Sequence, residues 1–209
     1  HVAHDLLHAL GGAKDGRRVV PDLYDFDMQS NPEIFRNPPG GLLIPKIFAT
    51  HAGPWDIMSQ HFIDLQQPPP PPSSFTRMQL GWIEPEQVVT VRPGEMREVT
   101  LQPLALGKGI LAARVPIDAT RYLLLENRQL VGGDVVLPSA GLLVLEIDTA
   151  LQEGSGVVRV ANANPGMPHL YGAPFVPGAG ERRIYRNRVA GVAVAALAVE
   201  PSGVLRLIV

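Results

Sequence analysis

The sequence has 209 residues, enough for one large domain or two small ones. Hydrophobic residues make up 45% of it and the formal net charge is -2, so we expect a packed core and no charge-driven binding of nucleic acid. The absence of cysteine excludes disulfides and thiolate metal sites. No apolar run reaches the roughly 18 residues of a membrane-spanning helix, and the longest, residues 189–199, is too short.

Residues 1–12 predict a helix, which the glycine pair at its end terminates because glycine readily adopts the left-handed conformation. His1, His4 and His8 are spaced i, i+3, i+7 along this helix, so they share one face. The sequence opens inside the helix without a capping residue or a visible signal peptide. We therefore expect this chain to be truncated at its N-terminus, as the later part of a longer protein.

A polar loop, GAKDGRR, is expected after the first helix, followed by an irregular, proline-rich segment over residues 21–74. The five consecutive prolines at 68–72 predict an extended spacer, since polyproline can form neither a helix nor a central strand. A short helix is expected over residues 73–81, with a serine available as its cap.

After Trp82 the sequence changes to apolar runs of strand length, separated by glycine- and proline-rich turn signals. No long helical pattern alternates with these runs, which favours an antiparallel β-sandwich over a parallel sheet. The predicted fold class is therefore α+β. We expect a helical and irregular segment over residues 1–85 and a β-sandwich domain over residues 86–209.

The first helix carries a pattern close to the H-E-x-x-H arrangement of zinc peptidases, but written HDLLH. His4 and His8 lie one turn apart, so both imidazoles can reach one Zn²⁺ ion. Asp5 follows the first histidine, where a carboxylate can act as base toward a metal-bound water. Its side chain is one methylene shorter than that of glutamate, a loss of about 1.5 Å in reach.

Several segments, taken in order, resemble the immune inhibitor A family of secreted zinc metallopeptidases. They are HDLLHALG, VPDLYDFD, GPWDIMSQ, LGWIEPEQV, YLLLENRQ, LPSAGLLVLEID and GVVRVANANPG, which together span roughly residues 1–165. The resemblance implies a zincin-like active-site segment over residues 1–85, a Zn²⁺ cofactor and secretion. The sequence departs from the family pattern in two places: Asp5 replaces a glutamate, and about eight residues are inserted before PDLYD.

The insertion leaves the third metal ligand open among three carboxylates. If it bulges out as a loop, Asp22 takes the position implied by the resemblance, and we favour Asp22 because its flanking residues match. If the chain leaves the helix without a bulge, Asp15 lies nearer to the usual spacing, and Asp25 is the third option. An ordinary role for such residues is turn formation and capping.

Met58 corresponds, by the same resemblance, to a methionine that packs beneath the metal ligands, with Trp55 and Asp56 shaping its turn. His51 and His61 flank this turn as further candidates to approach the site.

The sandwich carries two further expectations. Glu126 and Arg128 predict an internal ion pair that ties the sandwich to the first segment. Asp134 and Asp148 are candidates for a Ca²⁺ site, because members of the family often carry calcium.

The expected function is that of a zinc-dependent endopeptidase, in which a metal-activated water hydrolyses a peptide bond of an extended polypeptide substrate. Two alternatives remain open: a catalytically degenerate pseudo-peptidase marked by Asp5, and a non-enzymatic β-sandwich binding module. We expect a secreted protein with no nucleic-acid partner and no membrane span.

Overall fold

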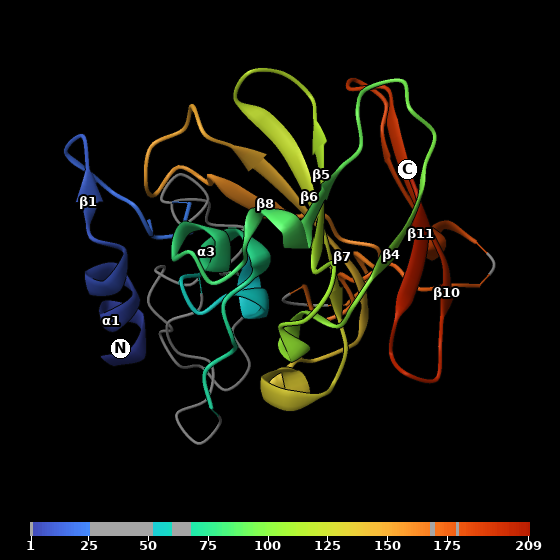
Figure 1. Cartoon of the computed structure of the whole chain (residues 1–209), viewed down its shortest axis with the longest axis horizontal. Coiled ribbons are helices and arrows are strands. Elements are labelled where there is room, and N and C mark those ends of the chain that lie inside the picture. Colours follow the sequence, from blue (N-terminus) through green and yellow to red (C-terminus); the bar gives the residue numbers. More distant parts are fainter. Residues whose placement is uncertain (1, 26–51, 60–67, 168–169, 179) are drawn as a thin grey trace.

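The computed structural model describes residues 2–25, 52–59, 68–167, 170–178 and 180–209 (Figure 1). Helix α1 (Val2–Gly11) leads into a hairpin of β1 (Ala13–Lys14) and β2 (Arg17–Arg18). Further along lie the 3-10 turn η3 (Gly53–Trp55) and helix α3 (Ser74–Gln79). The candidate residues His51 and His61 fall outside the described residues.

Two sheets form the rest of the molecule. The four-stranded sheet has the order β4 (Glu98–Leu101), β11 (Leu205–Ile208), β10 (Val192–Val199) and β9 (Ile184–Asn187), all antiparallel. The five-stranded sheet has the order β3 (Val88–Thr90), β5 (Ala112–Pro116), β6 (Arg121–Arg128), β7 (Gly141–Asp148) and β8 (Val158–Val160). Only β3 and β5 pair in parallel. The expectation of a mixed chain dominated by antiparallel sheet is confirmed.

The connections contain short 3-10 turns, which are η4 (Pro85–Gln87), η5 (Leu104–Leu106), η6 (Gly132–Val136) and η8 (Glu181–Arg183). Across the part of the chain that the structure describes, no helix combines the length and hydrophobicity needed to cross a membrane.

Strands β6 and β7 form the centre of the molecule because both of their faces are buried. Successive side chains of a strand point to opposite faces. Accordingly, Leu123 and Leu125 pack into the core between the two sheets, whereas Leu124 packs into a second core on the outer face of the five-stranded sheet. Burial on both faces explains why the sequence of these strands holds consecutive apolar residues, at 123–125 and 142–145, rather than an alternating pattern.

The second core joins the N-terminal segment to the five-stranded sheet. Leu7 of α1, Trp55 and Met58 contribute to it from the segment before residue 85. Leu143 and Val158 contribute from the strands after it. The N-terminal elements are therefore held against the sheet by shared apolar burial.

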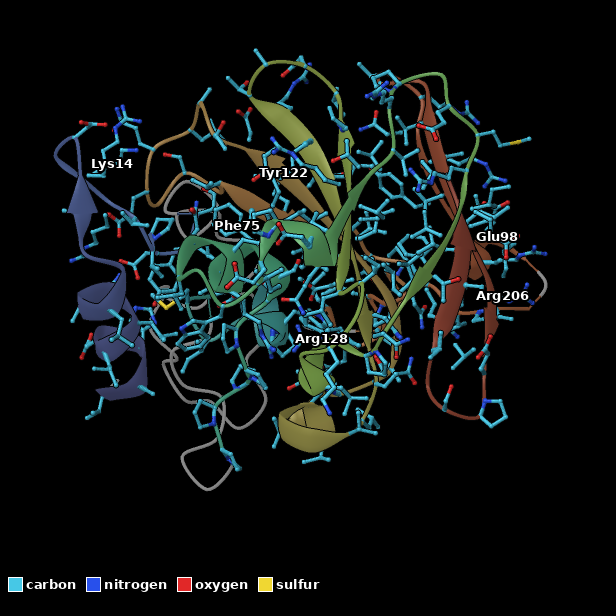
Figure 2. All side chains as sticks on the ribbon, viewed as in Figure 1. Lys14, Phe75, Glu98, Tyr122, Arg128 and Arg206 are labelled. Carbon is cyan, nitrogen blue, oxygen red and sulfur yellow. The ribbon has the colours of Figure 1, made fainter. Side chains whose placement is uncertain are left out.

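A buried ionic network reinforces this contact. Arg128 is fully buried, and its guanidinium donates to Glu126 at 2.8 Å and to both carboxylate oxygens of Asp134 at 2.7 and 2.9 Å (Figure 2). It also donates to the carbonyl oxygen of Trp55 at 3.1 Å. Burial lowers the pKa of Arg128, but the two carboxylates outweigh it and raise the pKa above its ordinary value. The predicted internal pair between Glu126 and Arg128 is confirmed.

One sequence expectation was wrong, and one strand had not been predicted. The segment GAKDGRR is a β-hairpin rather than a loop, with Asp15 and Gly16 at φ 52 and 75° between the paired residues Lys14 and Arg17. Positive φ at both turn residues is the requirement of a type I′ turn, which Asp-Gly satisfies. Strand β9 was also missed, because its sequence IYRN lies within a run of arginines that does not alternate clearly.

Candidate metal centre

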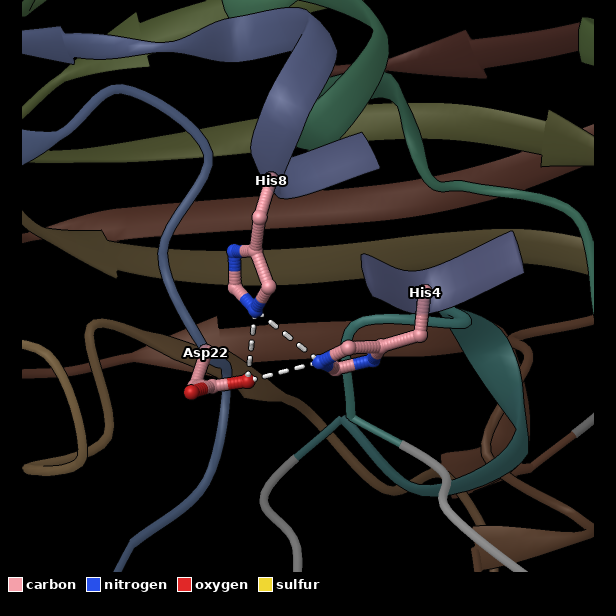
Figure 3. Close-up of side chains that lie close together, drawn as sticks. All are labelled: His4, His8 and Asp22. Atoms are coloured by element: carbon pink, nitrogen blue, oxygen red, sulfur yellow. Dashed lines mark hydrogen bonds and ion pairs between the residues drawn. The ribbon is translucent and has the colours of Figure 1, made fainter. Parts of the chain in front are cut away.

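Two imidazoles from helix α1 and a carboxylate from the chain that returns to it lie close together (Figure 3). His4 Nε2 lies 3.0 Å from His8 Nε2 and 2.8 Å from Asp22 Oδ1, and His8 Nε2 lies 3.2 Å from the same oxygen. His4 and His8 are adjacent because residues four apart in an α-helix lie one above the other. Among the described residues, this is the group of three His, Asp or Glu side chains whose ligand atoms converge.

Backbone carbonyls fix the orientation of both rings. Nδ1 of His4 donates to the carbonyl of Ile57 at 3.0 Å, and Nδ1 of His8 donates to that of Val20 at 2.8 Å. A carbonyl oxygen can only accept, so each Nδ1 must carry a hydrogen. The lone pair of each neutral ring is therefore on Nε2 and faces the other ring. This is how metal-binding histidines are usually oriented.

Of the three candidate carboxylates, Asp22 is the one that reaches the histidines. The hairpin bulges out and returns the chain to the end of α1. Val20 then lies beside the helix, where its carbonyl accepts from His8, and Asp22 follows two residues later. Asp15 lies exposed in the hairpin turn. Asp25 is buried elsewhere, with Arg159 3.8 Å from its carboxylate.

The close approach of α1 to the returning chain depends on Gly11. A Cβ atom at Gly11 would lie 2.6 Å from Cγ2 and 3.1 Å from the backbone nitrogen of Val20. Any larger residue would push Val20, and with it the acceptor of His8, away from the helix.

The turn that contains Met58 supports the other side of the site. Ile57 supplies the carbonyl that holds His4, and the carbonyl of Met58 accepts from the backbone of Leu23 at 3.0 Å. Met58 is fully buried, and no described contact makes it a ligand. Trp55 is likewise buried, and its indole donates to the carbonyl of Leu170 at 2.9 Å.

Asp56 ties this turn to helix α3. Its carboxylate accepts from the backbone of Met58 at 2.8 Å, from the backbone and hydroxyl of Ser73, and from the hydroxyl of Thr76 at 2.7 Å. Trp55, Asp56 and Met58 thus form a buried turn held by hydrogen bonds and packing, and their role beneath a metal centre stays a prediction.

The electrostatics of the cluster favour a positive charge. Burial lowers the pKa of His4, but its hydrogen bonds to Asp22 and Ile57 and the nearby carboxylates outweigh this, so the pKa lies above the ordinary value. Burial raises the pKa of Asp22, but the contacts with His4 and His8 and the hydrogen bond to Glu153 lower it overall. With both Nδ1 atoms committed to carbonyls, the contact between the two Nε2 atoms requires a shared proton or another cation.

Two further residues that the sequence analysis missed lie beside Asp22. Arg18 Nη1 is 3.2 Å from Asp22 Oδ2 and 3.2 Å from His8 Nε2. Oε1 of Glu153 accepts from Arg18 at 3.0 Å and from the backbone nitrogen of Asp22 at 3.0 Å. Arg18 precedes Asp22 by four residues, a spacing that the sequence displays. Nothing in the sequence connects Glu153 with residues so far away.

Asp5 is exposed on α1 and makes no hydrogen bond or ion pair with another described residue. Tyr24 is buried, with its ring parallel to that of His4 at a centroid distance of 6.2 Å. Of the two calcium candidates, Asp134 uses both oxygens on Arg128, and Asp148 accepts from the backbone of Ala150 in a turn.

The donor set fits a zinc ion. Zinc bonds of about 2.0–2.1 Å in tetrahedral geometry place neighbouring ligand atoms about 3.3 Å apart. The three observed separations, 2.8, 3.0 and 3.2 Å, are slightly shorter, as expected of atoms now sharing hydrogen bonds. Two imidazoles and one carboxylate match catalytic zinc sites, which keep a fourth position open for water or substrate.

A cleft of about 770 Å³ adjoins the cluster. Arg18, Asp22 and Glu153 line one part of it, and Val19, Phe75 and Leu151 provide apolar lining. A metal bound at the cluster would thus lie next to a space large enough for part of a peptide.

Comparisons of the chain with models of known protein families, with curated proteins and with solved structures gave no match.

Proposed function

We propose that this chain carries the zinc centre of a metallopeptidase similar to the immune inhibitor A family, with extended polypeptides as substrates. One observation carries the proposal: two Nε2 lone pairs and the Asp22 Oδ1 atom converge, while both Nδ1 atoms are held by backbone carbonyls. A zincin-like role for residues 1–85 and secretion of the protein belong to the same proposal and depend on the motif resemblance.

His4, His8 and Asp22 would hold the ion, and the adjoining cleft would receive the substrate. When bound, zinc lowers the pKa of a coordinated water and polarises a carbonyl group. The protein contributes orientation. The carbonyls of Ile57 and Val20 fix the two rings, and the buried turn of Trp55, Asp56 and Met58 holds the first of these carbonyls in place.

Asp5 is the residue on α1 whose carboxylate would accept the proton of the attacking water. General-base catalysis requires hydrogen-bond contact with that water. The short side chain of Asp5 and its exposed position make this contact harder than for glutamate. We therefore expect slow turnover, because small errors in position cost large factors in rate.

Metal content tests the centre directly. We expect the wild-type chain to bind about one Zn²⁺, measured by elemental analysis after dialysis, and His4→Ala and Asp22→Asn to bind none. Asp15→Asn is the matched control, because Asp15 lies on the neighbouring hairpin but outside the cluster, and asparagine tolerates its positive φ. Equal zinc content in the Asp15→Asn and Asp22→Asn variants would remove the proposed site.

The exposed position of Asp5 favours a second function, in which the zinc is bound but catalysis has been lost. Cleavage of a fluorophore-labelled unfolded polypeptide, assayed on the longest natural form of the protein, separates the two. Zinc-dependent cleavage that disappears in Asp5→Asn supports the peptidase. No cleavage by the zinc-loaded protein, together with turnover in Asp5→Glu, supports the degenerate form.

A further inference from the structure

The two carboxylate oxygens of Asp22 have different partners. Oδ1 faces both imidazoles, whereas Oδ2 lies 3.2 Å from Nη1 of Arg18. Hydrogen bonds to the second oxygen of a ligating carboxylate orient the first oxygen toward the metal. Arg18 supplies such a contact at Oδ2 of Asp22, and the same Nη1 atom lies 3.2 Å from Nε2 of His8.

Glu153 holds both partners of this contact. Its Oε1 atom accepts from Arg18 at 3.0 Å and from the backbone nitrogen of Asp22 at 3.0 Å. Glu153 belongs to the connection between β7 and β8, whereas Arg18 ends the hairpin. The contact therefore joins the sheet to the chain segment that carries the ligand.

We propose that Glu153 is a positioning residue for the metal centre: it orients Asp22 directly through the backbone and, by way of Arg18, through the outer carboxylate oxygen. This rests on the proposed zinc centre. The negative charge of Glu153 also offsets the positive charge of Arg18. Without Glu153, the guanidinium would be an uncompensated cation beside a divalent ion.

The exposure of the pair points to a role in metal binding rather than in folding. The side chains of Arg18 and Glu153 are 49% and 36% exposed, and ion pairs in such positions contribute little to stability. In contrast, residues that hold metal ligands from behind change metal affinity by about 10- to 100-fold when removed.

Zinc affinity, measured by competition with a chromophoric chelator, tests the proposal. Glu153→Ala is expected to bind zinc about 10- to 100-fold more weakly than wild type. Glu153→Gln should lose less, because its amide oxygen still accepts from the backbone of Asp22. Gln152→Ala, on the same exposed connection, is the control and should bind as wild type does.

Two readouts separate positioning from a general structural role. The denaturant midpoint of each variant, measured in excess chelator, should equal that of the wild type. The ligand-field absorption of the Co²⁺-loaded protein should change in Glu153→Ala, because the orientation of the Asp22 oxygen changes. A lower midpoint with an unaltered Co²⁺ spectrum would overturn the positioning role.

A double variant tests the route through Arg18. If Glu153 acts partly through Arg18, the affinity loss of Arg18→Met/Glu153→Ala should be at least about threefold smaller than the product of the two single losses. A loss equal to that product would overturn the route through Arg18.

Two outcomes distinguish this proposal from the proposed function. Wild type that binds no zinc would refute the metal centre itself, whereas zinc binding that is equal in wild type and Glu153→Ala would refute only the role of Glu153.

Discussion

At the scale of single residues, Arg128 is the arginine or lysine that is fully buried among the described residues. Its guanidinium is shared between Glu126, Asp134 and the carbonyl of Trp55. A buried ion is costly unless its partners compensate for lost hydration. Since Glu126 also accepts from the backbone of Ser74 at 2.6 Å, the network connects strand β6, the turn η6 and helix α3.

Arg128→Met is expected to lower the free energy of unfolding by about 3–5 kcal/mol, because two buried carboxylates lose their counter-charge. Urea denaturation monitored by circular dichroism measures this. Arg206→Met is the control. Arg206 pairs with Glu98 on the four-stranded sheet (Figure 2). Both side chains are about half exposed, and such pairs are worth about 0–1 kcal/mol. Equal losses in the two variants would contradict the structural role given to the network.

At the scale of elements, the site depends on how helix α1 ends. Gly12 adopts φ 64° and its backbone donates to the carbonyl of His8 at 3.0 Å, which closes the last turn. The hairpin then returns the chain to within contact of Gly11. The two histidines come from the helix and the carboxylate comes from the returning chain, so the packing distance between them sets the geometry of the cluster.

Gly11→Ala is expected to weaken zinc binding by tenfold or more and to lower the free energy of unfolding by about 1–3 kcal/mol, as overpacking does. The reason is the 2.6 Å contact that the new Cβ would make with Val20. Gly166→Ala is the control, since its Cβ would lie no closer than 3.6 Å to Asn164. Zinc titration and urea denaturation of both variants measure the effects, and wild-type affinity in Gly11→Ala would show that the distance is not critical.

At the scale of the whole molecule, a polar contact links the two sheets at the edge of their shared core. Tyr185 of β9 donates its hydroxyl to Glu146 of β7 at 2.6 Å, while its ring packs between the sheets. Burial raises the pKa of Tyr185, and the hydrogen bond and charge of Glu146 raise it further. A phenol with a raised pKa stabilises the fold below its unfolded pKa of about 10, and this contribution disappears as the pH rises through the folded pKa.

Tyr185→Phe is expected to cost about 1.5–3 kcal/mol at pH 7, because a hydrogen bond to a carboxylate is lost. The difference between wild type and variant should shrink as the pH is raised above about 10, because ionisation of the unfolded tyrosine removes the advantage of the wild type. Urea denaturation at pH 7, 10 and 11 measures this difference. A difference that does not change with pH would show that Tyr185 does not titrate as described.

Local patterns in the sequence predicted the features that depend on neighbouring residues. The segments RYLLLENR at 121–128 and GLLVLEID at 141–148 are strands β6 and β7, because consecutive apolar residues between polar ends and turn signals indicate a strand buried on both faces. The adjacency of His4 and His8 follows from helix periodicity alone. The Asp-Gly pair is also a local signal, typical of a hairpin turn, although the segment was predicted to be a loop.

The sequence by itself therefore determined the strand-rich fold class and the pair of histidines on one helical face, since both follow from the period of the backbone. Only the tertiary structure decided which of Asp15, Asp22 and Asp25 joins them, and that Glu153 supports the chosen one. These choices depend on where the chain returns in space, and that is set by packing against a sheet formed more than 100 residues later.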